Sequence, residues 1–140
     1  MVKIYIASPY TYGDKTDNVN LQIDAAEIIA SHGYAPMVPL FNHFWQIRHS
    51  HTETDWLKLD FVWLSCCDIL VRFRPIVNGK ELPSSGADAE EKFAREIGLP
   101  VFTFTNLAEL ADFLDNNEFV PGTDQAQIDK QRTPIDLTEV

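Results

Sequence analysis

The apolar residues of this chain gather in four short runs that have the length and the β-branched or aromatic content of buried strands. These runs cover residues 2–7, 34–38, 68–73 and 99–105. Segments with apolar residues at helical spacing follow them, at residues 18–32, 55–67, 85–98 and 106–116. Strands that alternate with helices in this way predict parallel strands joined by helical crossovers.

This alternation favours an α/β fold with one open parallel sheet of four to five strands and helices on both faces, of the Rossmann or flavodoxin-like type. We place this single domain at residues 1–116. Residues 117–140 have few large apolar side chains and no clear period, so we expect a C-terminal arm or tail there.

In the first helix, the spacing predicts a buried face made of Val19, Ile23, Ala26 and Ala30, after a cap at Thr16 or Asp17. In the last helix it predicts burial of the residues Leu107, Leu110, Ala111 and Leu114. The polar segment 74–83, with its Asn78-Gly79 turn, is expected to be a loop.

Glu90 interrupts the apolar stripe of the helix that begins after Ser85, our expected N-cap, and ends at Gly98. That stripe consists of Ala87, Phe93, Ala94 and Ile97. A carboxylate on such a stripe points towards the core or a cleft, and it lies within about two turns of the helix N-terminus, where the helix dipole favours an anion. We therefore expect Glu90 to be functional; the alternative is a peripheral side chain that reaches solvent.

Asp60 is a second misplaced acid, because segment 55–67 is apolar on most sides. Such a helix is typical of a buried element or of an interface between subunits. A carboxylate inside it is costly unless it is paired or used. The alternative is that Asp60 occupies a solvated edge of this helix.

Three loops are expected to meet at one edge of the sheet, because ligands of open parallel sheets bind beyond the carboxyl ends of the strands. The residues that we expect to bind substrate in these loops are Ser8, Pro9 and Tyr10, then Phe41, Asn42 and His43, then Ser84, Ser85 and Gly86. Tyr5 lies just below that edge, where its hydroxyl can donate to Glu90. Two carboxylates at such a site suit a nucleophile and a proton donor at a glycosidic carbon.

The composition narrows the class of function. A net charge of −10 argues against binding to nucleic acid polymers or to anionic membranes. The two cysteines, Cys66 and Cys67, are adjacent, so we expect two core thiols in a reducing compartment and no zinc site of the usual Cys type. Met1 leads directly into a strand-like run without a basic segment, and no apolar stretch is long enough to span a bilayer, so we expect a cytoplasmic protein.

Two common nucleotide-binding motifs are absent from the sequence. There is no Gly-Lys-Ser/Thr of a phosphate-binding P-loop, and the loop after the first strand has no G-x-G-x-x-G. We therefore expect no cofactor and no resident metal. A metal-dependent enzyme that uses His43, His49, His51, Glu53 and Asp55 is an alternative, although their spacing matches no common zinc pattern. A second alternative is a structural protein whose tryptophans bind a partner protein.

Four segments together resemble the nucleoside 2-deoxyribosyltransferase superfamily, which includes nucleoside 5′-monophosphate N-glycosidases. They are residues 3–10 (KIYIASPY), residues 38–43 (VPLFNH), Asp60 eight positions before Asp68, and residues 84–90 (SSGADAE) followed by Ala94 and by residues 98–101 (GLPV). Each segment is weak alone, and their order and spacing make the set specific.

The resemblance implies a covalent glycosyl intermediate on Glu90, with Asp60 as the second acid, Tyr5 orienting Glu90, and His43 against the base. It also implies a small-molecule nucleoside or nucleotide substrate and a homo-oligomer in which the neighbour's C-terminal region helps to close the site. Transfer to another base, hydrolysis, and a non-catalytic nucleotide-binding module all stay open.

Ser84 is a departure from the family pattern, because transferases that act on free nucleosides tend to have an aspartate six residues before the nucleophile. A hydroxyl at a helix N-terminus accepts a phosphate, which shifts weight towards nucleotide substrates. No arginine occurs between Ser8 and Asp17, and this shifts weight the other way.

Overall fold

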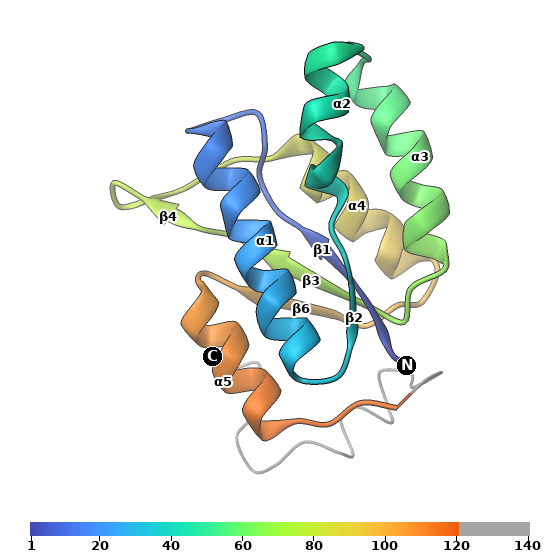
Figure 1. Cartoon of the computed structure of the whole chain (residues 1–140), viewed down its shortest axis with the longest axis vertical. Helices are drawn as coiled ribbons and strands as arrows, with labels where there is room; N and C mark the ends of the chain where they lie inside the picture. Colours follow the sequence, from blue (N-terminus) through green and yellow to red (C-terminus); the bar gives the residue numbers. More distant parts are fainter. Residues whose placement is uncertain (121–140) are drawn as a thin grey trace.

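The chain alternates between strands and helices along residues 1–120, the part that the computed structural model describes (Figure 1). In chain order the elements are β1 (Lys3–Ala7), α1 (Lys15–Ser31), β2 (Ala35–Met37), the 3-10 helix η1 (Pro39–Asn42), α2 (His43–Arg48), α3 (Glu53–Ser65), β3 (Ile69–Phe73), β4 (Ile76–Val77), β5 (Lys80–Glu81), α4 (Ser85–Glu96), β6 (Val101–Phe104) and α5 (Leu107–Asn116).

Four strands form one parallel sheet in the order β2-β1-β3-β6. Tyr5 lies near its centre, paired with Met37 on one side and with Leu70 on the other. From β1 the chain adds β2 on one side and later β3 on the other. The order in which strands are added therefore reverses at β1. The α/β class and the open parallel sheet expected from the sequence are confirmed.

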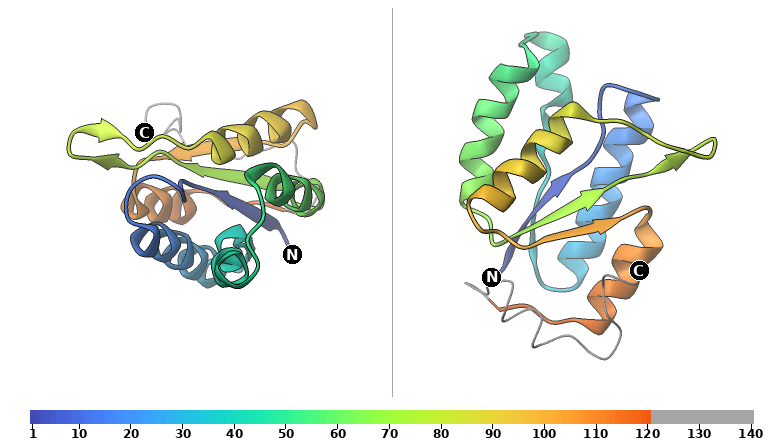
Figure 2. Two further views of the ribbon diagram at one scale, coloured as in Figure 1. Left: turned by 90° about the horizontal axis from the view of Figure 1, so that it is seen from above. Right: turned by 180° about the vertical axis from the view of Figure 1, so that it is seen from behind.

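Helices cover both faces of the sheet, as Figure 2 shows. Alternate residues of a strand point to opposite faces. Ile4 and Ile6 therefore enter the core beneath α1 and α5, whereas Tyr5 and Ala7 enter the smaller core beneath α3 and α4. The site described below lies on the side of this smaller core.

The face that α1 buries differs from the expected one. Val19 and Ala30 are not buried, and Ile23 is exposed, whereas Asn18 and Gln22 are buried together with the apolar residues Ala25, Ala26 and Ile29. Hydrogen bonds to backbone carbonyls explain why these two polar side chains are buried. The Asn18 amide donates to the carbonyls of Tyr10 and Tyr12, and that of Gln22 donates to the carbonyl of Ile6, so both buried amides have partners.

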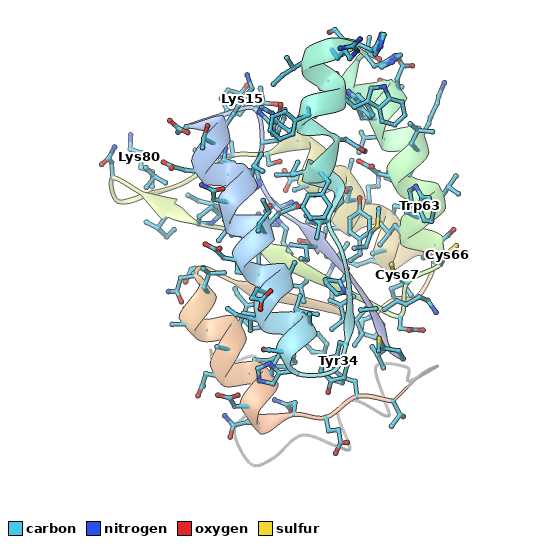
Figure 3. The ribbon with its side chains drawn as sticks, in the orientation of Figure 1. Lys15, Tyr34, Trp63, Cys66, Cys67 and Lys80 are labelled. Atoms are coloured by element: carbon cyan, nitrogen blue, oxygen red, sulfur yellow. The ribbon has the colours of Figure 1, made fainter. Side chains whose placement is uncertain are left out.

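Helix α3 is more exposed than its apolar sequence predicts. Leu59, Val62 and Trp63 are 44%, 63% and 56% exposed, and only Leu64 is fully buried. Figure 3 shows Trp63 and Cys66 at the carboxyl-terminal end of this helix. The expectation of two core thiols is wrong for Cys66, which is exposed, whereas Cys67 is buried; neither forms a disulfide.

The structure contains a short helix and a hairpin that the sequence pattern did not predict. His43–Arg48 forms the short helix α2, although its apolar side chains Phe44 and Ile47 are exposed. The segment that was expected to be a loop contains the antiparallel hairpin β4–β5, which projects from the domain (Figure 1). Asn78 and Gly79 form its turn, both with positive φ angles (52° and 77°), a conformation that these two residue types adopt readily.

The ends of the helices also differ from expectation. Helix α1 begins at Lys15, and its cap is Asp14, whose carboxylate accepts the Asp17 amide at 3.0 Å.

The buried face of helix α5 consists of Leu110, Phe113 and Leu114. Leu107 is only partly buried, and so is Ala111.

Residues 117–120 follow α5 and return to the core. Phe119 is 5% exposed and stacks with Phe102, and its backbone N–H donates to the Tyr34 hydroxyl at 3.0 Å. Burying such a ring stabilises the domain by roughly 1.5–3 kcal/mol. The core therefore extends past residue 116, and the rest of the expected arm lies outside the described residues.

Candidate active site

A pocket of about 420 Å³ lies where the loops after β1, β2 and β3 meet, a size in the usual range of small-molecule sites. The predicted site residues in its wall are Ser8, Tyr10, Asn42, His43, Asp60, Ser84, Ser85, Gly86 and Glu90. Of the other three, Tyr5 lies beneath Glu90, Pro9 is buried outside the wall, and Phe41 is 61% exposed and also outside it.

Glu90 is held from below by Tyr5. The Glu90 side chain is buried, and the Tyr5 hydroxyl donates a hydrogen bond to its Oε2. Burial and, after it, the charge of Asp60 raise the pKa of Glu90 to about 8, although the Tyr5 bond and the charge of Arg72 act in the opposite direction. Burial, followed by the Glu90 charge, raises the pKa of Tyr5 well above its ordinary value, so Tyr5 remains a proton donor in this bond.

Asp60 enters the pocket wall from α3. Its Oδ1 is buried and has no hydrogen-bond partner, so this carboxyl does not lie on a solvated edge of the helix. Burial raises the pKa of Asp60 to about 6. The charge of Asp60 raises the pKa of Glu90, so the two carboxyls titrate as a pair that holds one proton between roughly pH 6 and pH 8. Because the pKa of Glu90 is the higher, that proton lies mainly on Glu90, and the form with an ionised Glu90 and a protonated Asp60 is the minor one.

Arg72 is a buried cation beside this pair that sequence analysis missed. It belongs to β3 and is 1% exposed. Its Nη2 lies 3.0 Å from Asp88 Oδ1, while its Nε and Nη1 have no hydrogen-bond partner. Its positive charge lowers the pKa of Glu90 and so favours the ionised nucleophile. The available signal was a charged residue inside a strand that is otherwise apolar.

The N-cap of α4 is Ser84, not Ser85 as the sequence pattern indicated. The Ser84 hydroxyl accepts the Ala87 amide at 3.1 Å, and the helix begins at Ser85, one residue earlier than a cap at Ser85 would place it. This leaves the Ser85 hydroxyl free to donate to Glu53 Oε1 at 2.8 Å. Glu53, the first residue of α3, therefore reaches the start of α4.

Aromatic and amide side chains form the opposite wall. The Tyr10 hydroxyl is hydrogen-bonded to His43 Nδ1, which joins the loop after β1 to α2. Gln46 accepts hydrogen bonds from the indole N–H of Trp56 and from the backbone of His51. Flat rings near hydrogen-bonding groups suit a planar heterocycle. From the sequence, His51 was a possible metal ligand and the tryptophans were candidates for protein interaction, because contacts between loops leave no periodic signal.

Ser8 offers a further hydrogen-bonding group in the wall. Its side chain is 5% exposed, and its hydroxyl oxygen has no partner. Orphan polar atoms that face a pocket are the groups that a ligand satisfies.

Within residues 1–120, no three His, Cys, Asp or Glu side chains gather in a way that would hold a metal ion. No helix in this part of the chain has the length and apolar character needed to cross a membrane.

With this geometry established, comparison with known proteins identifies the family. A family model described as "Domain of unknown function (DUF7768)" matches residues 2–104. The chain belongs to this family. The match covers every pocket residue described above, so the pocket is part of the DUF7768 domain. No curated protein matches the chain.

A solved structure adds a likeness in fold. The DUF7768 domain is similar to "2-desoxiribosyltransferase from Leishmania mexicana", with a TM-score of 0.56 and 19% sequence identity. The match covers 75% of this chain and 65% of that one, so the chain spans less than two thirds of the length of this relative. At this identity the likeness concerns the fold.

Proposed function

We propose that this protein cleaves the N-glycosidic bond of nucleosides or their 5′-monophosphates and transfers the sugar to a second base. The observation that carries this proposal is Glu90, a buried carboxyl held by Tyr5 in the pocket and electrostatically coupled to Asp60. The fold of the solved 2-desoxiribosyltransferase supports the same chemistry, because its name describes transfer of a deoxyribosyl group.

In the first step, the minor form with an ionised Glu90 and a protonated Asp60 reacts, and the Glu90 carboxylate attacks C1′ of the sugar. A bond forms between a Glu90 oxygen and C1′, and the bond from C1′ to the base nitrogen breaks with its electron pair on the base. Asp60 delivers its proton to the leaving base and becomes a carboxylate. Because Tyr5 holds Glu90 Oε2, the carboxylate is fixed before attack, and such positioning can contribute up to ~7–11 kcal/mol to barrier lowering.

In the second step, an acceptor attacks C1′ and releases Glu90. If the acceptor is a base, it forms a new C1′–N bond and gives its proton to Asp60, which restores the starting protonation. If the acceptor is water, it forms a C1′–OH bond and gives one proton to Asp60, and the products are the free base and the free sugar, or the sugar phosphate when the substrate is a monophosphate. The same residues therefore serve transfer and hydrolysis, and hydrolysis to base and sugar phosphate is the alternative function.

A panel assay tests the proposal. The protein is incubated with purine and pyrimidine nucleosides and their 5′-monophosphates, with and without a second free base, and products are separated by chromatography. A swapped base indicates transfer, and a free base without acceptor indicates hydrolysis.

The controls are two matched carboxyl-to-amide variants. Glu90→Gln should abolish both reactions and trap no glycosyl ester in mass spectrometry. Glu27→Gln, at an exposed position of α1, should behave as the wild type. Binding of nucleosides by thermal shift without any base release would contradict the proposal and favour a non-catalytic binding module.

A further inference from the structure

Glu53 is an acidic residue that sequence patterns gave no reason to assign to substrate binding, and it lines the pocket where α3 and α4 both begin. Its Oε1 accepts the hydrogen bond of the Ser85 hydroxyl at 2.8 Å. The same oxygen is 3.1 Å from the position that a Cβ would take on Gly86. The Glu53 carboxylate therefore rests against the first turn of α4.

The first turn of α4 also presents hydrogen-bond donors. The first amides of an α-helix have no partner within the helix. Ser84 satisfies the amide of Ala87, whereas the amides of Ser85 and Gly86 have no hydrogen-bond partner among residues 1–120. This end of the pocket thus combines unpaired backbone donors with a carboxylate acceptor.

The charge of the wall is negative on the side of Glu90. Three carboxyl groups line the pocket, from Glu53, Asp60 and Glu90, and its described lining contains no lysine or arginine. Lys15 lies outside the lining, with its Nζ 5.8 Å from the centre of the Tyr10 ring. A cation that would neutralise a bound phosphate is therefore missing from the wall that residues 1–120 form.

Glu53 is held about one and a half helical turns from Glu90 through its bond to Ser85. Ser85, its partner, is five positions before Glu90 on α4, or roughly 7 Å along the helix axis. Glu53 and Glu90 line the same pocket, and the negative charge of Glu53 raises the pKa of Glu90. A sugar joined to Glu90 through C1′ can therefore extend its C5′ end towards Glu53.

We propose that Glu53 selects substrates with a free 5′-hydroxyl and disfavours those with a 5′-phosphate; this inference rests on the proposed function. A hydroxyl accepts a hydrogen bond from a backbone amide and donates its own proton to the carboxylate, so it satisfies both kinds of group at once. A phosphate carries a charge of about −1.5 to −2 at pH 7 and is repelled by the carboxylate. The substrate class is thus the free nucleoside.

A structural role for Glu53 predicts a different result. If its bond to Ser85 only fastens α3 to α4, its removal lowers stability and leaves substrate preference unchanged. The test is therefore the ratio of kcat/KM for a 2′-deoxynucleoside to kcat/KM for its 5′-monophosphate with the same base. It is measured for the full chain as wild type, Glu53→Gln, Glu53→Ala and Glu27→Gln, with folding checked by circular dichroism.

The wild type should favour the nucleoside at least tenfold, and this ratio should shrink as salt screens the carboxylate. Both Glu53 variants should lower the ratio at least tenfold by improving use of the monophosphate, while Glu27→Gln, with the same charge change, should keep the wild-type ratio. A wild type that prefers monophosphates, or Glu53 variants with an unchanged ratio, would overturn the inference and leave the proposed function standing. Absence of cleavage with every substrate would overturn both.

Discussion

The Tyr5 hydroxyl in β1 donates a hydrogen bond to the Glu90 carboxylate in α4, across 85 positions of sequence. Both side chains are buried, Tyr5 completely. The bond occupies Oε2 of Glu90, which itself lies in the pocket wall. It also stabilises the ionised form of Glu90 against the effect of burial. Tyr5 is thus a positioning residue for the proposed nucleophile.

Replacing Tyr5 with Phe removes this bond and keeps the ring. The pKa of Glu90 should then rise, because the bond lowers it, and the form with an ionised Glu90 and a protonated Asp60 should become rarer. We expect kcat/KM at the optimum to fall roughly 10- to 100-fold, since a hydrogen bond to a charged group contributes about 1.5–3 kcal/mol. A pH profile of kcat/KM should also show the alkaline limb at higher pH.

The matched control is Tyr34→Phe, which removes a buried hydroxyl that accepts the Phe119 amide on the other side of the sheet (Figure 3). This variant should lose stability in urea and keep the wild-type pH profile. Equal profiles for the wild type and Tyr5→Phe would show that Tyr5 does not position Glu90.

The activity of the wild type should follow a bell-shaped pH curve. Below about pH 6 both carboxyls are protonated, so no nucleophile exists; above about pH 8 both are ionised, so no proton donor exists. The maximum of kcat/KM should therefore lie between these values. A profile that is flat from pH 5 to pH 9, measured with a fast-reacting nucleoside, is incompatible with this pair.

Asp60→Asn should remove one side of that bell. An amide cannot donate a proton to the leaving base, so we expect turnover to slow by roughly 10²–10⁴. The remaining activity should rise through the pKa of Glu90, now below about 8 because the Asp60 charge that raised it is gone, and should not decline at higher pH. Unfolding of this variant at neutral pH would indicate a structural role for Asp60.

Glu90→Gln should change the pH dependence of stability as well as abolish activity. The pKa of Glu90 is about 8 in the folded chain and close to 4.5 when the carboxyl is solvated. Folding therefore retains a proton that the unfolded chain releases, so wild-type stability is full below pH 4.5 and declines until about pH 8, by up to roughly 5 kcal/mol. The variant lacks this decline. Urea unfolding at pH 5 and pH 8.5 measures the difference, and parallel losses in both proteins would refute it.

The expected homo-oligomer stays a prediction, and the exposed apolar face of α3 offers a test. Trp63→Arg places a charge among Leu59 and Val62 and should lower the mass measured by light scattering if copies meet there. Ile76→Arg is the control, since Ile76 is equally exposed on the distant hairpin. Identical masses for the wild type and both variants would exclude this face as the contact.

The sequence was most informative where periodicity and burial agree. The four strands of the sheet and the helix of Glu90 follow from apolar runs and from one acid on an apolar stripe. That stripe was not perfect, because Ile97 is 43% exposed at the end of the helix. The pocket position of Asp60 likewise follows from an acid inside an apolar segment.

The remaining features depend on contacts between distant segments. Asn18 and Gln22 look like surface residues until the sheet edge supplies carbonyls for them. Arg72 is buried in a strand, and Glu53 meets Ser85 only because α3 and α4 begin side by side. From sequence alone, Ser84 favoured nucleotides. In the structure the Ser84 hydroxyl oxygen caps α4, and the carboxylate of Glu53 from α3 lies beside it on Ser85.

The buried amide of Gln22 has one more consequence. It donates to the Ile6 carbonyl at the end of β1 and accepts the Leu40 amide of η1 through its oxygen. Apolar contacts tolerate sliding, whereas hydrogen bonds have direction, so this side chain fixes the spacing of the two loops on either side of it. These loops of the pocket wall are therefore ordered before a ligand binds, so no binding free energy is lost in ordering them.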